Sequence, residues 1–518
     1  MKNEKIVTIT GNSLTIDQVK AVARDNAQVI IGPDAAKKCT KGRRVLEYYI
    51  NKKDKIYGVT TGFGSLSKYF IDPDKAAQLQ VNLLRSHNAG VGKPVPADVV
   101  RATMLIRANF IASGLSGARP IILETLVKMI NQEIIPFMPS QGSVGSSGDL
   151  APLAAMALVL MGEGEAFYKN KRMSGKKAMR SAGIPLIKIL SKEGLALING
   201  ATLMAGYASL AVYDAINLAK LSDVGVALTL EGVIGVKEAF DERLQLPRGY
   251  KGQIESAENV RNLIEGSQIL AGSSPRVQDS YVMRCAPVIL GASRDSIEYV
   301  KKQIQTEING SCDNPLVILD DRYKAGGIVL AGGNFHGQPA ALPMDFLGIA
   351  VAELANSAEI RMERLLNSNY SEGLPAFLMP NPGLDSGFMV PQYTAAGLVN
   401  ENKGLAWPNS VDSIPVCGGQ EDHVSMGTNS ARSAWKIIQN TQYVLGAELM
   451  VCAQALDLRE KISQKKGSLV LRSIRDFIRT QIPFVEKDQS LQKYMEQMKQ
   501  WVANEDILNI INNKIELL

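Results

Sequence analysis

Residues 142–150 combine the residue types and the order that best fit covalent chemistry. They read Gly-Ser-Val-Gly-Ser-Ser-Gly-Asp-Leu and lead directly into an apolar segment. Glycine permits positive φ angles and lets the backbone approach itself closely. In a tight bend, the Gly148 nitrogen could reach the carbonyl carbon of Ser146, and loss of two waters would then close Ser146-Ser147-Gly148 into a methylidene-imidazolone ring. Such a ring is an electrophile, which no unmodified side chain provides.

Two other interpretations of this loop stay open at this point. The loop could be an ordinary glycine- and serine-rich connection that caps a helix starting near Asp149, because such residues are common in turns. It could also be the flexible serine loop of the fumarase and argininosuccinate-lyase superfamily. In that superfamily Met-Pro and a lysine follow the serines, and nothing of the kind follows Ser147. Other motifs must therefore decide the question.

Polar motifs elsewhere in the chain could complete a site around the loop. Tyr57 begins the sequence Tyr-Gly-Val-Thr-Thr-Gly-Phe-Gly, whose glycines would allow a mobile loop to carry the phenol over a substrate; a plain hairpin turn is the alternative. All three histidines, His87, His336 and His423, lie in glycine-rich or acidic segments. Glu421 precedes His423 too closely for the i, i+4 spacing of zinc ligands on a helix, so we expect no metal site.

A segment around residue 280 fits recognition of a substrate carboxylate. Gln278, Tyr281 and Arg284 are spaced i, i+3 and i+6, so on a helix each neighbouring pair would share a face. A guanidinium binds a carboxylate through two parallel hydrogen bonds, although a polar cluster on a helix surface is the alternative. Asn199 and Asn314 stand beside apolar runs. Because buried amides must find partners, each of them is a helix cap or a site residue.

Taken together, and in this order along the chain from residue 57 to residue 460, these motifs resemble the histidine and aromatic amino-acid ammonia-lyase family. That family usually carries Ala-Ser-Gly where this chain has Ser146-Ser147-Gly148. The side chain of Ser146 would lie outside the ring, so we expect ring formation to survive this difference. The resemblance also implies a helical homotetramer whose active sites mix residues from three chains.

The resemblance implies a role for each motif. Ser146, Ser147 and Gly148 would form the prosthetic group 4-methylidene-imidazol-5-one, with no metal. The other expected site residues are Tyr57 as the loop base, Arg284 as the carboxylate anchor, Asn199 and Tyr281 beside the electrophile and the substrate, Phe335 near the ring, His87 and Glu421 at the substrate side chain, and Gln278 and Asn314 as further binding residues. A phenol with an ordinary pKa near ~10 needs electropositive neighbours, such as helix N-termini, to act as a base at neutral pH.

Composition limits the class of protein. The chain has 518 residues, of which 46% are hydrophobic and 21% are charged, values typical of a soluble globular protein. The net charge of +6 is small, and no basic stripe is interleaved with aromatic residues, so we expect no nucleic-acid partner. The polar start of the chain, the lack of an uninterrupted apolar stretch of spanning length and five scattered cysteines favour a reduced, cytoplasmic protein without a membrane anchor.

Helices are expected to dominate the fold. Strand signals are confined to short runs at 6–9 and 29–31, with a capping box at Thr15 opening a helix between them. Apolar residues at helical spacing predict helices over 120–132, 200–221, 344–366 and 431–456. We therefore predict a mainly α, ammonia-lyase-like fold: a long-helix bundle core (201–518) with a small mixed N-terminal region (1–200) that carries the Tyr57 loop and the prosthetic-group loop.

Histidine is the expected substrate, with urocanate as the product, because an imidazole N–H can donate to Glu421 and a phenyl ring cannot. A tyrosine (or phenylalanine) ammonia-lyase, or a tyrosine 2,3-aminomutase, is the alternative, because residues 334–338 and 426–429 resemble that branch somewhat more. A third hypothesis is a helical relative that never forms the ring, for which Ser146 in place of alanine is the sole support.

Overall fold

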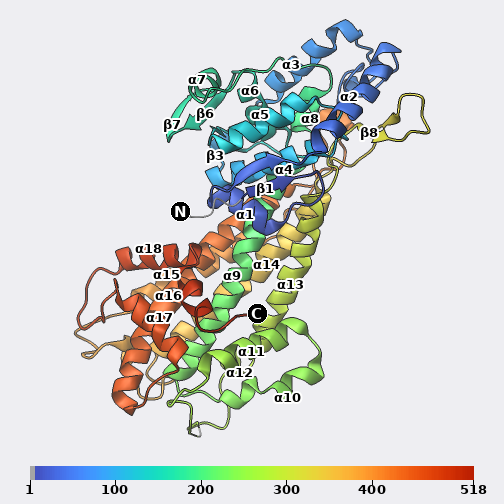
Figure 1. The fold of residues 1–518 in the computed structure, drawn as a ribbon. Coiled ribbons are helices and arrows are strands. Elements are labelled where there is room, and N and C mark those ends of the chain that lie inside the picture. The colour runs from blue at the N-terminus through green and yellow to red at the C-terminus, as the bar shows by residue number, and fades with distance from the viewer. Residues whose placement is uncertain (1–5, 273) are drawn as a thin grey trace. The chain divides into compact units, whose positions relative to one another are not determined.

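Helices dominate the protein, as the sequence predicts. The structure is a computed structural model that describes residues 6–272 and 274–518. Most of these residues lie in helices, and the strands are short and pair only in sheets of two or three (Figure 1). The predicted fold class is therefore confirmed. Within the described residues, no helix is both long and apolar enough to cross a membrane.

The described residues form two compact units, each assembled from segments that are distant in sequence. The first unit comprises residues 1–213, 301–345 and 408–432, and the second comprises residues 214–300, 346–407 and 433–518. The predicted division at residue 200 cuts the chain once, whereas these units join separate segments. Four of the five boundaries between the units fall inside helices, and the fifth, between residues 407 and 408, falls between elements. The four helices are α9 (Thr202–Gly232), α13 (Ala286–Glu307), α14 (Gln338–Leu366) and α16 (Gly427–Ser463).

The first unit holds the mixed N-terminal part of the chain. Its helices are α1 (Ile16–Arg24), α2 (Ala35–Asn51), α3 (Ala76–His87), α4 (Ala97–Ala112), α5 (Pro120–Asn131), α6 (Leu150–Leu160), α7 (Gly175–Ser181) and α8 (Glu193–Ile198). Its strands are β1 (Ile6–Ile9), β2 (Gln28–Ile31), β3 (Val91–Pro94), β4 (Ile135–Pro136), β5 (Pro139–Gln141), β6 (Glu165–Tyr168), β7 (Lys171–Ser174), β8 (Leu316–Leu319) and β9 (Gly327–Leu330). Short 3-10 turns include η1 (Gly64–Leu66), η2 (Pro73–Lys75) and η6 (Cys417–Gly419).

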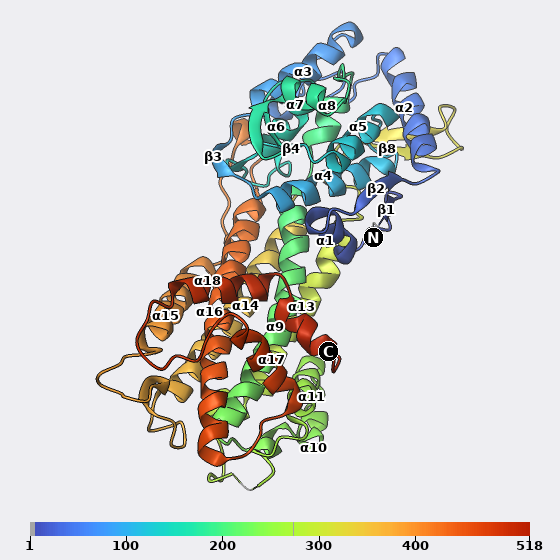
Figure 2. The same ribbon diagram turned by 60° about the vertical axis from the view of Figure 1, so that its left-hand side comes forward.

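Local sequence signals account for the start of this unit. Strands β1 and β2 pair in parallel, with Ile6 opposite Gln28. The helix between them, α1, begins at the predicted capping box, in which the Thr15 hydroxyl accepts from the Gln18 N–H and the Gln18 side chain accepts from the Thr15 N–H. Helices α3, α6 and α8 pack against one another (Figures 1 and 2). Because α6 is apolar all round, it is buried among its neighbours from Pro152 to Leu160.

The described residues of the second unit form helices joined by loops, with no paired strands other than the isolated Pro382–Asp385 bridge. Besides its parts of the four long helices it contains α10 (Glu242–Gln245), α11 (Lys251–Ile264), α12 (Tyr281–Arg284), α15 (Met389–Leu405), α17 (Leu469–Arg479), α18 (Gln492–Ala503) and α19 (Asp506–Asn512), with 3-10 turns η3 (Lys237–Phe240), η4 (Leu246–Arg248) and η5 (Ala376–Leu378). Helix α17 contacts α11 and α19, and α19 also contacts α18 (Figure 2).

The four helices predicted from apolar spacing are confirmed as α5, α9, α14 and α16, and three of them extend beyond the predicted ends. Helix α14 shows why. The sequence places its start at Met344, directly after a proline, because proline usually marks a helix boundary. In the structure α14 begins at Gln338 and Pro343 lies inside it. The missing proline N–H removes one hydrogen bond near the start of the helix, and the surrounding packing outweighs that loss.

Candidate active site

The predicted prosthetic-group loop is held against the start of α9. The N–H of Gly200 donates to the carbonyl of Ser147 (3.0 Å), and the N–H of Asp149 donates to the carbonyl of Gly200 (2.9 Å). Between these two bonds Gly148 has a φ of +74°, and a Cβ atom on it would overlap the Gly200 backbone. Only glycine fits this position without strain. The backbone on both sides of Gly148 is thus pinned, while Ser146 lies buried at 6% exposure.

A buried carboxylate fastens this loop to two distant helices. Asp149 is fully buried, and its Oδ2 accepts from the N–H groups of Leu203 (2.9 Å) and Met204 (3.0 Å) at the start of α9. Its Oδ1 accepts from the hydroxyls of Thr428 (2.6 Å) and Ser143 (3.2 Å). Burial raises the pKa of Asp149 even though these four hydrogen bonds favour the charged form. Sequence reasoning assigned Asp149 only to the start of a helix and missed this role.

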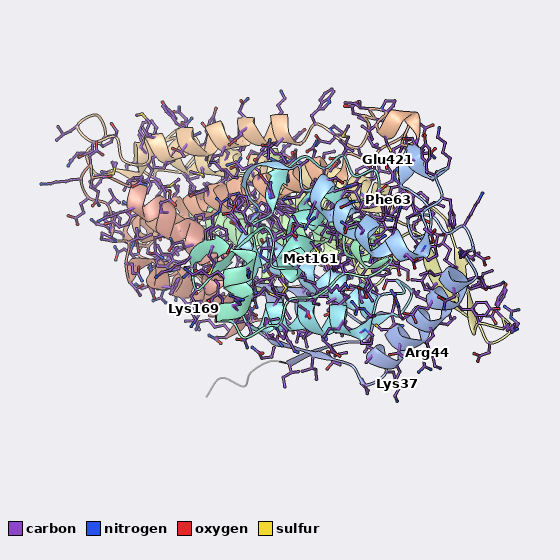
Figure 3. The ribbon with its side chains drawn as sticks, turned by 90° about the horizontal axis from the view of Figure 1, so that it is seen from above. Lys37, Arg44, Phe63, Met161, Lys169 and Glu421 are labelled. Atoms are coloured by element: carbon purple, nitrogen blue, oxygen red, sulfur yellow. The ribbon has the colours of Figure 1, made fainter. Side chains whose placement is uncertain are left out.

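A cavity of about 360 Å³ opens beside the loop, entirely within the first unit. Five of the predicted site residues line it: Tyr57, His87, Ser147, Asn199 and Glu421. Apolar side chains from three helices supply much of the remaining wall: Leu79, Leu83, Leu150 and Leu195. Two of the lining residues, Phe63 and Glu421, are labelled in Figure 3. Residues from five separate parts of the sequence therefore converge here.

Hydrogen bonds fix the polar groups of the cavity. The hydroxyl of Ser147 donates to Oε1 of Glu421 (3.1 Å). The N–H of Gly64 donates to the phenol oxygen of Tyr57 (3.0 Å). The amide nitrogen of Asn199 donates to the carbonyl of Asn314 (2.9 Å), while its Oδ1 is buried without a partner among the described residues. A buried acceptor without a partner is costly, so this oxygen is suited to a donor on a bound group.

Burial also shifts the titration of Tyr57 and His87. The pKa of Tyr57 is raised, first by loss of water around the phenol and then by the charge of Glu421, while the N–H of Gly64 acts in the opposite direction. Burial lowers the pKa of His87, and Glu421 partly offsets this effect. The Gly64 N–H is an electropositive neighbour of the Tyr57 phenol, but burial and Glu421 outweigh it, so the pKa of Tyr57 stays raised.

Two other predicted residues of this unit lie outside the cavity wall. Asn314 stands behind Asn199, and its own Oδ1 accepts from the N–H of Gly332 (2.8 Å). Phe335 is half-buried in the connection before α14 and is not among the lining residues. Sequence reasoning missed Phe63 and Cys417, which do line the cavity. The glycines around Phe63 were the available signal. Within the described residues, no cluster of three His, Cys, Asp or Glu side chains could hold a metal.

The predicted carboxylate-binding segment belongs to the second unit. Tyr281 and Arg284 share a face of α12, with the guanidinium carbon 4.7 Å from the centre of the phenol ring. The helical placement of Gln278 is wrong, because α12 begins only at Tyr281. The preceding segment is instead held by Asp279, whose carboxylate accepts from the Val236 N–H (2.6 Å) and from Arg276. None of the three predicted residues lines the cavity of the first unit.

The fold and the loop define a class of protein. The family profile of aromatic amino acid lyases matches residues 14–480, and the chain belongs to this family. Curated relatives include the histidine ammonia-lyase of Alkaliphilus metalliredigens (strain QYMF), 47% identical over 515 residues and covering 99% of this chain and 100% of the relative. The histidine ammonia-lyase of Streptococcus pyogenes serotype M1 is 46% identical over 517 residues, 99% of each chain. The predicted family and enzyme class, a carbon–nitrogen lyase, are confirmed.

Solved structures agree with this placement. The histidine ammonia-lyase from Trypanosoma cruzi has a TM-score of 0.91 at 35% identity, over 99% of this chain and 96% of that one. The tyrosine aminomutase from Streptomyces globisporus has a TM-score of 0.93 at 34% identity, over 99% of this chain and 100% of that one.

Proposed function

We propose that the protein is an ammonia-lyase that eliminates ammonia from L-histidine to give urocanate. The observation that carries this proposal is the position of Glu421, whose carboxylate lines the cavity within 3.1 Å of Ser147. A carboxylate there can accept from an imidazole N–H. Relatives named histidine ammonia-lyase at 46–47% identity over nearly the whole chain support the same substrate.

Ser146-Ser147-Gly148 fits the expected precursor of 4-methylidene-imidazol-5-one. The pinned backbone around Gly148, the buried position of Ser146 and the orientation of the Ser147 hydroxyl into the cavity support this assignment. The partnerless Oδ1 of Asn199 marks a place for a polar group in the same cavity. When formed, the ring would supply the electrophile that receives the substrate amine. Loss of the Ser147 hydroxyl would also free Glu421 Oε1 to accept from the substrate.

The other side chains of the cavity would each have a separate role in the reaction. Tyr57 would remove the β-proton, because its phenol is held in place at the cavity wall by the Gly64 N–H. His87 and Glu421 would contact the substrate ring, and the leucines of the wall would exclude water around it. The raised pKa of Tyr57 means that a further positive charge must approach the phenol before it can act as a base near neutral pH.

Arg284 is our candidate for that charge and for the carboxylate anchor, supplied by another copy of the chain. Arg284, Tyr281 and Gln278 belong to the second unit and do not line the cavity of the first. The Arg284 Nε is buried without a partner among the described residues, and the Tyr281 ring is 70% exposed. These features support a homotetramer whose sites combine residues of several chains, with Phe335 and Asn314 completing the site. We also propose a cytoplasmic location.

A second candidate function is a tyrosine ammonia-lyase or tyrosine 2,3-aminomutase. The TM-score of 0.93 to a tyrosine aminomutase favours it. Incubation of the protein with histidine, tyrosine and phenylalanine in separate assays distinguishes the candidates, because each elimination product is a conjugated acid that absorbs in the ultraviolet. Intact mass spectrometry tests the ring independently, since ring formation removes the mass of two waters.

A further inference from the structure

A tight turn ties Cys417 to Glu421. Val416 and Glu421 pair as an isolated antiparallel bridge, in which the Val416 N–H donates to the Glu421 carbonyl (2.9 Å). Between them η6 turns through Cys417 and Gly418, both with positive φ angles of 54° and 63°. For a non-glycine residue such as Cys417 this conformation is uncommon, and it persists only where the surroundings hold it. The turn therefore holds the backbone of Cys417 close to the backbone of Glu421.

The Cys417 sulfur lies against the loop that carries Tyr57. A Cβ atom built on Gly64 would overlap Cys417 Sγ, so sulfur occupies the space that a side chain at Gly64 would fill. Gly64 is the residue whose N–H donates to the Tyr57 phenol. Turns η1 and η6, which contain Gly64 and Cys417, are in contact. A continuous chain of contacts thus runs from the phenol through Gly64 and Cys417 to Glu421 and on to Ser147.

These groups face one cavity that is suited to a ligand. Tyr57, Gly64, Cys417 and Glu421 all line it, together with Asn199, whose partnerless Oδ1 is on a side chain only 2% exposed. From this geometry we infer that the Gly64–Cys417 contact is a positioning contact, which holds the Tyr57 phenol at a set distance from Glu421 and the precursor triad. The inference rests on the proposed function and deepens it, because it assigns a positioning role to Cys417, which takes no part in the proposed proton transfer or ring formation.

Cysteine suits this role by size. Cys417 is exposed as a whole, and its Sγ covers Gly64 on one side. Alanine would remove that cover and open Gly64 to water, and leucine would place a branched carbon where the single sulfur now sits. Serine keeps an atom at the γ position and should largely preserve the contact. Cys39 controls for the loss of a thiol elsewhere in the same unit: it is fully buried in α2, with its sulfur near the Ile111 carbonyl and away from the cavity.

Hydrogen–deuterium exchange of the peptide that contains Gly64 tests the contact without any substrate. Cys417→Ala should speed exchange of this peptide at least tenfold, since the Gly64 amide then loses its support, whereas Cys417→Ser and Cys39→Ala should leave it near wild type. Unchanged exchange in Cys417→Ala would overturn the inference. This measurement does not depend on which amino acid is the substrate, so it separates this inference from the proposed function.

The pH dependence of kcat tests the consequence for the base, with whichever amino acid the wild-type enzyme turns over. Glu421, His87 and the Cys417 thiol face Tyr57. The Gly64 N–H lowers the pKa of Tyr57 by more than Cys417 raises it, so loss of the Gly64 bond decides the direction of the shift. Cys417→Ala and Cys417→Leu should lower kcat about tenfold with little change in KM, and should move the rise of kcat to higher pH. Cys417→Ser should recover most of kcat. Equal losses in KM and kcat, with no displacement of the pH profile, would show a merely structural residue and refute the inference.

Discussion

Replacing Glu421 by glutamine tests the proposed substrate most directly. The carboxylate is half-buried in the cavity wall, and its Oε1 lies 3.1 Å from the Ser147 hydroxyl, so it faces the precursor triad. A hydrogen bond from an imidazole N–H to a charged carboxylate contributes about 1.5–3 kcal/mol, and one to a neutral amide oxygen about 0.5–1.5 kcal/mol. The difference of ~1.5 kcal/mol corresponds to about a tenfold loss of kcat/KM for histidine.

A substrate ring without a donor should respond in the opposite direction. Phenylalanine would leave the Glu421 carboxylate desolvated and without a donor, at a cost of about 1–3 kcal/mol, and glutamine relieves most of it. Glu421→Gln should therefore reduce the preference for histidine over phenylalanine by ~100-fold in kcat/KM, measured from the ultraviolet absorbance of the two products. Asp422→Asn, which changes the neighbouring exposed carboxylate, is the matched control. An unchanged preference in Glu421→Gln, or a wild-type enzyme faster with tyrosine than with histidine, refutes the assignment.

Three further predictions concern the ring, the base and anchor, and the second unit. Ser147→Ala should retain the full unmodified mass and lose turnover by orders of magnitude, whereas Ser146→Ala should still lose two waters and remain active; a processed, active Ser147→Ala protein would contradict the ring. Tyr57→Phe should lower kcat about 10²-fold or more, while Arg284→Lys should mainly raise KM, about tenfold; small, equal effects in steady-state kinetics would make both residues structural. Burial raises the pKa of Glu231 to about 7. The folded state therefore binds the proton of this carboxyl more tightly than the unfolded state does. As a result, the free energy of unfolding should fall by about 3 kcal/mol between pH 4.5 and 7. Urea unfolding should show that decline, which Glu231→Gln should abolish.

Much of the fold follows from local sequence signals. The capping box at Thr15 and the apolar spacing in the long helices depend on residues within a few positions of each other, and the structure confirms them. The positions of helix ends depend less on the neighbouring sequence. Pro343 predicts a helix start at Met344, yet α14 continues back to Gln338. Pro343 is the sixth residue of α14 and removes one internal hydrogen bond. The packing of the surrounding residues outweighs that loss, so packing decides the boundary.

Part of the candidate site could be predicted from local sequence, and part could not. Glycine-rich motifs locate Tyr57 and the precursor triad, because the backbone conformations of these loops require glycine at particular positions. The long-range contacts that hold the site in place have no such local sequence motif. Asp149 accepts from Thr428, 279 residues later in the chain, and Cys417 lies against Gly64 across a comparable separation. Nothing in the residues adjacent to Asp149 or Cys417 encodes these partners, so only the folded structure reveals them.

The long sequence separation of these contacts determines whether ring formation precedes or follows folding of the first unit. The Asp149 carboxylate is held by two N–H groups of α9 and by the Thr428 hydroxyl at the start of α16. Ser425 adds a further bond from the same late segment, because its hydroxyl donates to the carbonyl of Gly145 (3.0 Å) within the loop. The loop thus has its full set of contacts only when residues 408–432 have joined the first unit. Closure of Ser146-Ser147-Gly148 requires that constrained backbone, so ring formation should follow folding of the whole first unit and not precede it.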